Sequence, residues 1–177
     1  MQSPEERFTQ LMHEVGEPLR RYVVRRVRPD QVDDVLADVF LVVWRRLDDV
    51  PADEVLPWCY GVAHLCVANA YRSQRRHLEL VDKLQRDRPT PAPDDDPDLA
   101  EALEQLSGTD RELIRLWAWE RLQPREIGAV VGMSANAVSL RLSRARRKLL
   151  ELLRQDRVGA GQNQGESTEG GRDDARR

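Results

Sequence analysis

The stretch from Leu122 to Leu153 constrains the fold most, because it predicts two helices joined by a tight turn. Pro124 suits the first turn of a helix, and Gly132 suits the left-handed conformation of a helix end. Ser134 then suits the N-cap of a second helix. Apolar residues recur in that helix at three- and four-residue steps and predict one buried face: Val138, Leu142, Ala145, Leu149 and Leu152.

The opposite face of this second helix is cationic and carries Arg141, Arg144, Arg146, Arg147 and Lys148. Two short-linked helices, of which the second is apolar inside and basic outside, are typical of a helix-turn-helix. In that motif the second helix lies in the major groove of DNA. The alternative is a helical hairpin with a solvated basic face, but the agreement of caps, turn and charge favours DNA binding.

The charge of the chain is segregated along the sequence. The net charge of −3 opposes general nucleic-acid binding. Acidic residues concentrate in 30–54 and 94–104, and basic residues in 72–88 and 141–154, so different faces can meet different partners. The mean hydropathy of −0.64, the lack of a long apolar run and the acidic start predict a cytoplasmic protein.

The two cysteines, Cys59 and Cys66, predict buried thiols. Seven residues apart on one helix, they would lie about 10 Å apart along its axis, too far for a disulfide. A zinc site with His13, His64 or His77 is an open alternative, although no close-spaced ligand pair occurs. We expect no metal, no cofactor and no enzymatic activity, because no phosphate loop, nucleophile elbow or catalytic carboxylate pair is found.

The N-terminal half predicts helices throughout. A capping box at residues 3–6 starts either two helices or one kinked helix that ends near Arg28. A second helix spans about Gln31 to Leu47, with Asp30 as its expected cap, and a third runs from about 54–58 to Leu84 and becomes basic after Tyr71. The acidic side of the second helix is either a match to the helix dipole or a docking face for a basic partner.

Proline and aspartate dominate residues 88–97, which read RPTPAPDDDP and predict an extended linker. Its acidic end either mimics nucleic acid by charge or is only a solvated tether. We therefore expect an all-α fold of two small helical domains, 1–88 and 98–154, joined by a flexible linker at 89–97. The second domain contains a short helix at 98–106, a capping box at 109–112 and the helix-turn-helix, and a disordered tail follows at 155–177.

This layout resembles the extracytoplasmic-function family of bacterial sigma factors. The stretch DDVLADVFLVVWRRL at 33–47 is similar to the family's helix for binding the RNA polymerase clamp. Residues 122–149 are similar to its region 4, and residues 57–76 resemble its helix for reading the −10 element more loosely. The resemblance implies a dissociable initiation subunit whose partners are core RNA polymerase, promoter DNA and an anti-sigma factor, and which is a monomer when free.

The resemblance also implies roles for individual residues. On the polymerase-binding helix these are Asp34, Asp38, Leu41 and Arg45. At the −10 element they are Trp58, Leu65, Asn69, Arg72, Arg75 and Arg76. At the −35 element they are Asn136, Ser139, Leu140, Arg141, Ser143, Arg144 and Arg146. Arg144 is the candidate for a base contact, since arginine binds a guanine edge with two hydrogen bonds.

The chain departs from the family at Leu65, where members often carry an asparagine that supports a flipped −10 base. Leucine cannot donate this hydrogen bond, and Asn69, one turn further along, is the candidate substitute. Ala37 is a milder departure on the clamp helix. Two other functions are open alternatives. A stand-alone helix-turn-helix regulator would need a dimer and a palindromic site, and a polymerase-sequestering protein would never contact promoter DNA.

Overall fold

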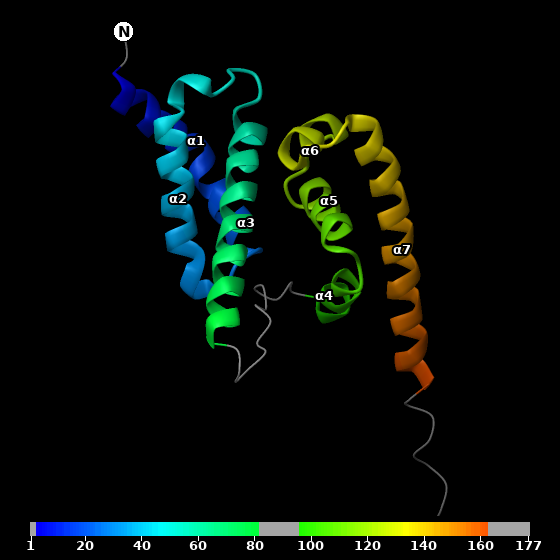
Figure 1. Cartoon of the computed structure of the whole chain (residues 1–177). Helices are drawn as coiled ribbons and strands as arrows, with labels where there is room; N and C mark the ends of the chain where they lie inside the picture. Colours follow the sequence, from blue (N-terminus) through cyan, green and yellow to red (C-terminus); the bar gives the residue numbers. More distant parts are fainter. Residues whose placement is uncertain (1–2, 82–95, 163–177) are drawn as a thin grey trace, which may run out of the picture.

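The computed structural model describes residues 3–81 and 96–162, with side chains described for 3–74 and 96–155. Every regular element in these ranges is a helix, as predicted (Figure 1). Three helices with two short 3₁₀ turns form an N-terminal unit: α1 (Pro4–Val24), α2 (Val32–Arg45) and α3 (Val55–Val81). Four helices form a C-terminal unit: α4 (Pro97–Glu104), α5 (Gly108–Ala118), α6 (Pro124–Val131) and α7 (Ala135–Gln162).

Helix α1 begins at the predicted capping box. The Ser3 hydroxyl accepts a hydrogen bond from the Glu6 amide at 3.2 Å, and the Glu6 carboxylate accepts one from the Ser3 amide at 2.9 Å. The helix then continues through Pro18 to Val24 as a single element. Of the two alternatives for this segment, one continuous helix is therefore correct.

The three long N-terminal helices bury one aliphatic core, in which Val15, Leu19, Val39 and Val43 are fully buried. Such burial of branched side chains is the main source of stability in a bundle of this size. The cysteines lie in the same core as free thiols, which confirms that prediction. Burial, with a smaller contribution from the charge of Glu14, raises the pKa of Cys59 to about 12.

The C-terminal unit follows the predicted helix-turn-helix closely. Gly132 ends α6 with a φ of 73°, a left-handed conformation that glycine adopts without strain. Ser134 caps α7 by accepting a hydrogen bond from the Ala137 amide at 3.2 Å. The predicted apolar face of α7 is buried at Val138, Leu142 and Ala145.

Two predicted helix caps are wrong. Asp30 does not cap α2, because its carboxylate pairs with Arg28 at 3.1 Å and the N-cap residue is Gln31. The capping box expected at 109–112 is replaced by an earlier N-cap, in which the Ser107 hydroxyl accepts a hydrogen bond from the Asp110 amide at 3.2 Å. The earlier start adds two residues to α5 and leaves Glu112 inside the helix.

The last helix is longer than predicted, since α7 continues to Gln162. A disordered tail beginning at residue 155 is therefore wrong for its first residues. The sequence after Leu153 has no proline, and a helix propagates more easily than it nucleates, so α7 extends past its apolar stripe. Most of the predicted linker and the tail beyond residue 162 lie outside the described residues.

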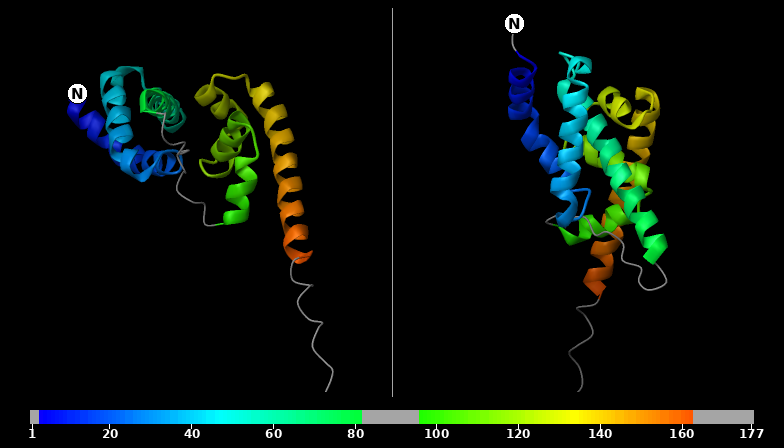
Figure 2. Two further views of the ribbon diagram at one scale, coloured as in Figure 1. Left: turned by 60° about the horizontal axis from the view of Figure 1, so that its bottom comes forward. Right: turned by 60° about the vertical axis from the view of Figure 1, so that its left-hand side comes forward.

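The two helical units are not separate bodies. The N-terminal half of α3 packs on α6, and both views in Figure 2 show these helices side by side. At this contact a Cβ atom added to Gly61 would lie 3.9 Å from the Cα of Val130. This contact between the two units could not be predicted from the sequence. Among the described residues, no helix is both long and apolar enough to cross a membrane.

Candidate promoter and polymerase interfaces

The turn between α6 and α7 depends on Gly128, which is not among the predicted turn residues. A Cβ atom added to Gly128 would lie 2.4 Å from the carbonyl oxygen of Met133, closer than real Cβ contacts come. The Met133 amide also donates a hydrogen bond to the Gly128 carbonyl at 3.0 Å. Two glycines four residues apart, at 128 and 132, thus permit the close turn that sets the direction of α7.

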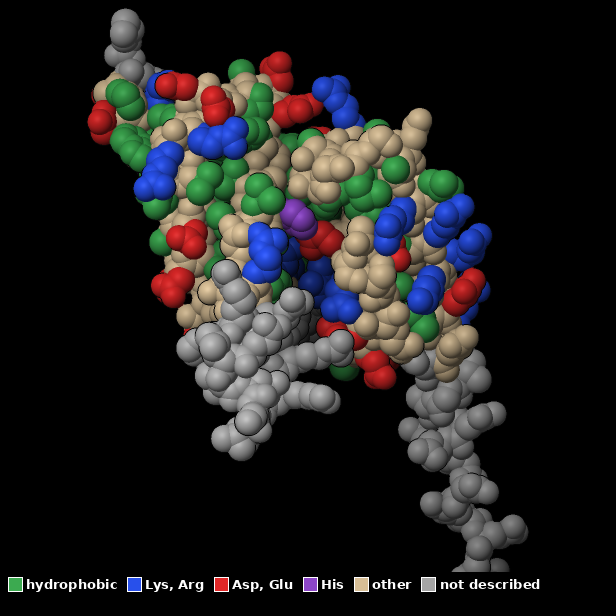
Figure 3. Space-filling view, in the orientation of Figure 1, with side chains coloured by type: hydrophobic (Ala, Val, Ile, Leu, Met, Phe, Trp, Pro, Cys, Tyr) green, Lys and Arg blue, Asp and Glu red, His purple; other side chains and the backbone are tan. Residues whose placement is uncertain are grey.

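Helix α7 presents most of the predicted −35 residues to solvent, and Figure 3 shows basic side chains gathered along this part of the molecule. Those exposed are Asn136, Ser139, Leu140, Ser143, Arg144 and Arg146. The Arg146 guanidinium lies 4.1 Å from the centre of the Trp117 ring, a cation–π contact that holds it toward α5. Arg144 is exposed, and among the described residues no ion pair holds it.

Arg141 is held by its own domain. Its Nε donates a hydrogen bond to the Asp110 carboxylate at 2.5 Å, and its Nη2 donates to the Ser107 hydroxyl at 3.4 Å. Burial by itself raises the pKa of Asp110, but the hydrogen bonds from Arg141 and Ser107 outweigh it and lower that pKa. The same cap that starts α5 therefore also fixes α7 against it.

The predicted polymerase-binding residues share one exposed face of α2. Asp34, Asp38, Leu41 and Arg45 follow one another at three- and four-residue steps, and Leu41 is 45% exposed. Trp44 extends this face, since it is 40% exposed and meets the ring of Phe8 edge-on at 5.2 Å. The face thus combines an acidic end with an apolar patch.

Four of the predicted −10 residues lie along one side of α3: Trp58, Leu65, Asn69 and Arg72. Trp58 is partly buried beneath Arg46, whose guanidinium is 5.3 Å from the ring centre. Leu65 is 62% exposed, so this solvent-exposed position holds a leucine where the family often has asparagine. Arg72 donates a hydrogen bond to the side-chain oxygen of Asn69. The side chains of Arg75 and Arg76 lie outside the described residues.

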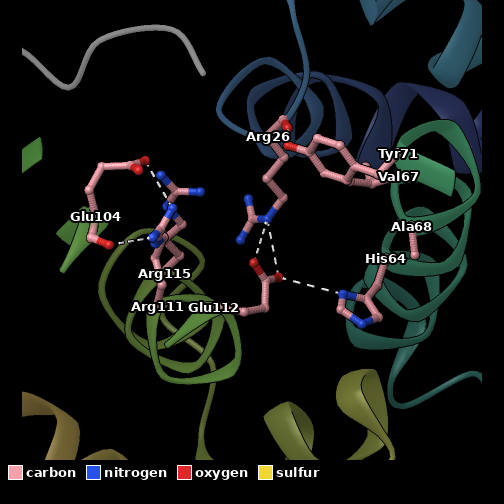
Figure 4. Close-up of a pocket in the computed structure, with 10 residues that line it drawn as sticks. Arg26, His64, Val67, Ala68, Tyr71, Glu104, Arg111, Glu112 and Arg115 are labelled. Atoms are coloured by element: carbon pink, nitrogen blue, oxygen red, sulfur yellow. Dashed lines mark hydrogen bonds and ion pairs between the residues drawn. The ribbon is translucent and has the colours of Figure 1, made fainter. Parts of the chain in front are cut away.

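A cavity of about 370 Å³ separates α3 from α5, and charged side chains from both units line it (Figure 4). Arg26, only 3% exposed, donates hydrogen bonds from Nε to both carboxylate oxygens of Glu112, at 3.1 and 3.0 Å. Burial alone raises the pKa of Glu112, but the charge of Arg26 and the nearby His64 outweigh it and lower the pKa to about 2.

Metal binding has no support in the described part of the chain, where no three His, Cys or acidic side chains gather as ligands. The thiols of the zinc alternative, Cys59 and Cys66, lie in the hydrophobic core, and the side chain of His77 lies outside the described residues.

Comparison with known proteins agrees with this arrangement. Residues 97–149 match the family model for Sigma-70, region 4. RNA polymerase sigma factor CarQ of Myxococcus xanthus is 38% identical over 144 residues, which cover 75% of this chain and 80% of CarQ. RNA polymerase sigma factor CnrH of Cupriavidus metallidurans is 32% identical over 142 residues, covering 71% of this chain and 74% of CnrH.

Solved structures show the same fold. CnrH in complex with the cytosolic domain of CnrY aligns with a TM-score of 0.61 and 30% identity, over 84% of this chain and 88% of CnrH. The sigma factor RpoE of Bartonella quintana, in complex with the anti-sigma factor NepR, aligns with a TM-score of 0.69 and 23% identity, over 83% and 96% of the two chains. The chain therefore belongs to the extracytoplasmic-function family of RNA polymerase sigma factors, which recognise promoters and initiate transcription.

Proposed function

We propose that three surfaces of this sigma factor divide the work of initiation. The exposed face of α2 binds core polymerase, α3 handles the −10 element, and α7 reads the −35 element. The observation that carries the proposal is the placement of α7, whose buried stripe packs on its own unit while Ser139, Ser143 and Arg144 face outward. Side chains in that position reach base edges when the second helix of a helix-turn-helix enters the major groove.

The −10 surface of α3 carries groups that can hold an extruded base. Extracting a base from the duplex costs a few kcal/mol, and stacking and hydrogen bonding to the protein must offset this cost. Trp58 supplies a ring, and the Asn69–Arg72 pair supplies hydrogen-bonding groups on the same side of α3. Because Leu65 offers only an apolar contact, we propose that Asn69 is the amide that supports the base.

The polymerase supplies most of the affinity in this proposal. A chain with a net charge of −3 gains little from phosphate attraction, since phosphate neutralisation by basic residues dominates nucleic-acid affinity. Once both helical units are held by the polymerase, each meets its promoter element at high effective concentration. We propose that the units correspond to domains 1–88 and 98–154, and that the protein acts in the cytoplasm with the polymerase.

An anti-sigma factor is the further partner that we propose. CnrH, which is 30% identical in its solved structure, is recorded in complex with the cytosolic domain of CnrY. Leu41 and Trp44, exposed on α2 beside Asp38, form the apolar and acidic face that such a partner would cover. Covering it would prevent polymerase binding, because the two partners would compete for one surface.

The test is run-off transcription with purified core polymerase on a library of genomic promoters. We expect promoter-specific transcripts that require the protein, and their absence from every promoter would contradict the proposal. Leu41→Asp should abolish core binding in a pull-down assay, because it places a charge in the apolar patch of α2. Leu150→Asp is the matched control, since Leu150 is 56% exposed on α7, away from that face, and should bind core normally.

A further inference from the structure

One arginine of the N-terminal unit is buried against carboxylates of the C-terminal unit. Besides Glu112, the Arg26 guanidinium binds Glu120, with 3.2 Å between Nη1 and Oε1. The side chains of Arg26 and Glu120 are 3% and 2% exposed, and that of Glu112 is 15% exposed. In the described part of the chain, both carboxylates that neutralise Arg26 thus come from across the interface, 86 and 94 residues away.

The N-terminal unit orients Arg26 for this contact. Arg26 Nη1 donates a hydrogen bond to the carbonyl oxygen of Tyr22 at 3.0 Å, and the guanidinium lies 3.5 Å from the centre of the Tyr22 ring. The Tyr71 hydroxyl donates a hydrogen bond to the carbonyl oxygen of Arg26. The arginine is therefore preorganised, so little side-chain entropy is lost when the carboxylates arrive.

Two other side chains of the N-terminal unit also contact the Glu112 carboxylate. The Tyr22 hydroxyl donates a hydrogen bond to Glu112 at 3.0 Å. Figure 4 shows His64, whose Nδ1 lies 3.7 Å from the same carboxylate. Removing one partner of such a buried group leaves an uncompensated charge, which is far more unfavourable than separating both partners into water. The cluster therefore favours two states, fully closed or fully open, over intermediate positions.

The closed state covers part of α3. Gly61 packs on Val130, and Glu54 pairs with Arg125 at 3.0 Å at the end of the contact. A second cavity there is lined by Trp58 and Leu65 from α3 and by residues 129–132 from α6. The C-terminal unit thus lies beside Trp58 and Leu65, although Leu65 remains 62% exposed.

We propose that Arg26, Glu112 and Glu120 form an intramolecular latch that keeps the free sigma factor closed. Engagement of both units by polymerase supplies the free energy that opens the latch and separates α3 from α6. The role of polymerase rests on the proposed function, whereas the latch itself rests on the buried cluster alone.

The latch can be tested in the full chain by measuring the distance between nitroxide labels on Glu17→Cys in α1 and Glu151→Cys in α7, both exposed positions. The native thiols are buried with raised pKa values and react slowly with the label. We expect one narrow, short distance for the otherwise unchanged chain. Glu112→Gln combined with Glu120→Gln should shift the long-distance fraction from about 10% or less to a majority.

Asp48→Asn is the matched control, because it removes an equal charge from a pair with Arg7 that lies within the N-terminal unit. A double variant that keeps the narrow distance while its circular dichroism matches the parent would overturn the latch. If that variant does not fold, Gly61→Leu provides a second route, since the larger side chain pushes against Val130 and should open the chain, whereas Gly61→Ala should not. An unchanged distance for Gly61→Leu would equally contradict the closed state.

These distances need neither polymerase nor promoter. If run-off transcription yields no promoter-specific transcript, the proposed function is rejected but the latch is not. If the distance between the labels does not change in the variants, the latch is rejected but the proposed function is not.

Discussion

Three arginines on one helix have three different environments. Arg141 is tied to Asp110, Arg146 lies over the Trp117 ring, and Arg144 is exposed. From the sequence they are equivalent members of a basic face. Their difference arises from α5, which supplies a carboxylate and a ring to two of them and leaves the third to face outward.

Arg144→Ala tests base readout at the residue scale. Loss of a bidentate guanine contact should weaken promoter binding by roughly 1–3 kcal/mol and relax specificity at a single −35 position. The measurement is holoenzyme binding to a set of −35 variants. Equal weakening on every sequence would instead make Arg144 a phosphate contact.

Arg141→Ala tests whether the Asp110 pair is structural. Partly exposed ion pairs contribute about 1 kcal/mol or less, so the free energy of unfolding in urea should fall by that amount. Asp110→Ala should cost a similar amount, and the double variant should cost less than the sum of the two. If the effects are instead additive and only Arg141→Ala changes the salt dependence of DNA binding, Arg141 contacts phosphate.

At the scale of the element, the helix-turn-helix depends on the close approach between α6 and the start of α7. Pro124, Gly132 and Ser134 mark the ends of the helices and were found in the sequence because their roles are local. Gly128 has a helical backbone like any other residue, and only the fold places a carbonyl oxygen beside it. A close approach of this kind leaves no periodic signal.

Gly128→Ala should therefore destabilise the C-terminal unit, although alanine is the better helix former. The added methyl group would meet the Met133 carbonyl oxygen, and overpacking of this kind typically costs about 1–3 kcal/mol or more. Urea unfolding measures this, and −35 binding should fall in parallel. Gly16→Ala is the control, since nothing lies within 4 Å of its added Cβ, and it should be neutral or slightly stabilising. Equal stability of the two variants would contradict the close approach.

At the scale of the whole molecule, the buried cluster makes the closed state dependent on pH. The pKa of Glu112 is about 2 in the closed chain, against an ordinary value of 4.5. Because closure lowers this pKa, the ionised Glu112 stabilises the closed state fully above pH 4.5, and this stabilisation is lost as the pH falls toward 2. The difference between these two pKa values corresponds to about 3 kcal/mol in favour of the closed state.

The distance between labels at positions 17 and 151 should therefore lengthen between about pH 4.5 and 2. In Glu112→Gln the neutral amide cannot titrate, so this acid-dependent step should be absent. Asp48→Asn should retain it. An identical acid response of the parent and Glu112→Gln would show that Glu112 does not couple pH to closure.

The sequence by itself determined the helices, the core and the family. Capping signals and apolar spacing act over a few residues, so Ser3, Gly132 and the stripe of α7 could be read without coordinates. The misplaced caps at Asp30 and Thr109 were errors of the same local kind, because neighbouring hydroxyl and carboxyl groups compete for one helix end.

Only the tertiary structure decided which of those residues meet. In the sequence, Arg26, Glu112 and Glu120 look like ordinary surface charges. Arg26 is 86 residues from Glu112 and 94 from Glu120, and no periodicity links them. Packing of α3 on α6 brings them together, and burial then turns them into a strongly coupled cluster, since charges interact more strongly away from water. Local chemistry therefore sets each helix, whereas long-range packing sets which faces of those helices remain available to polymerase and promoter.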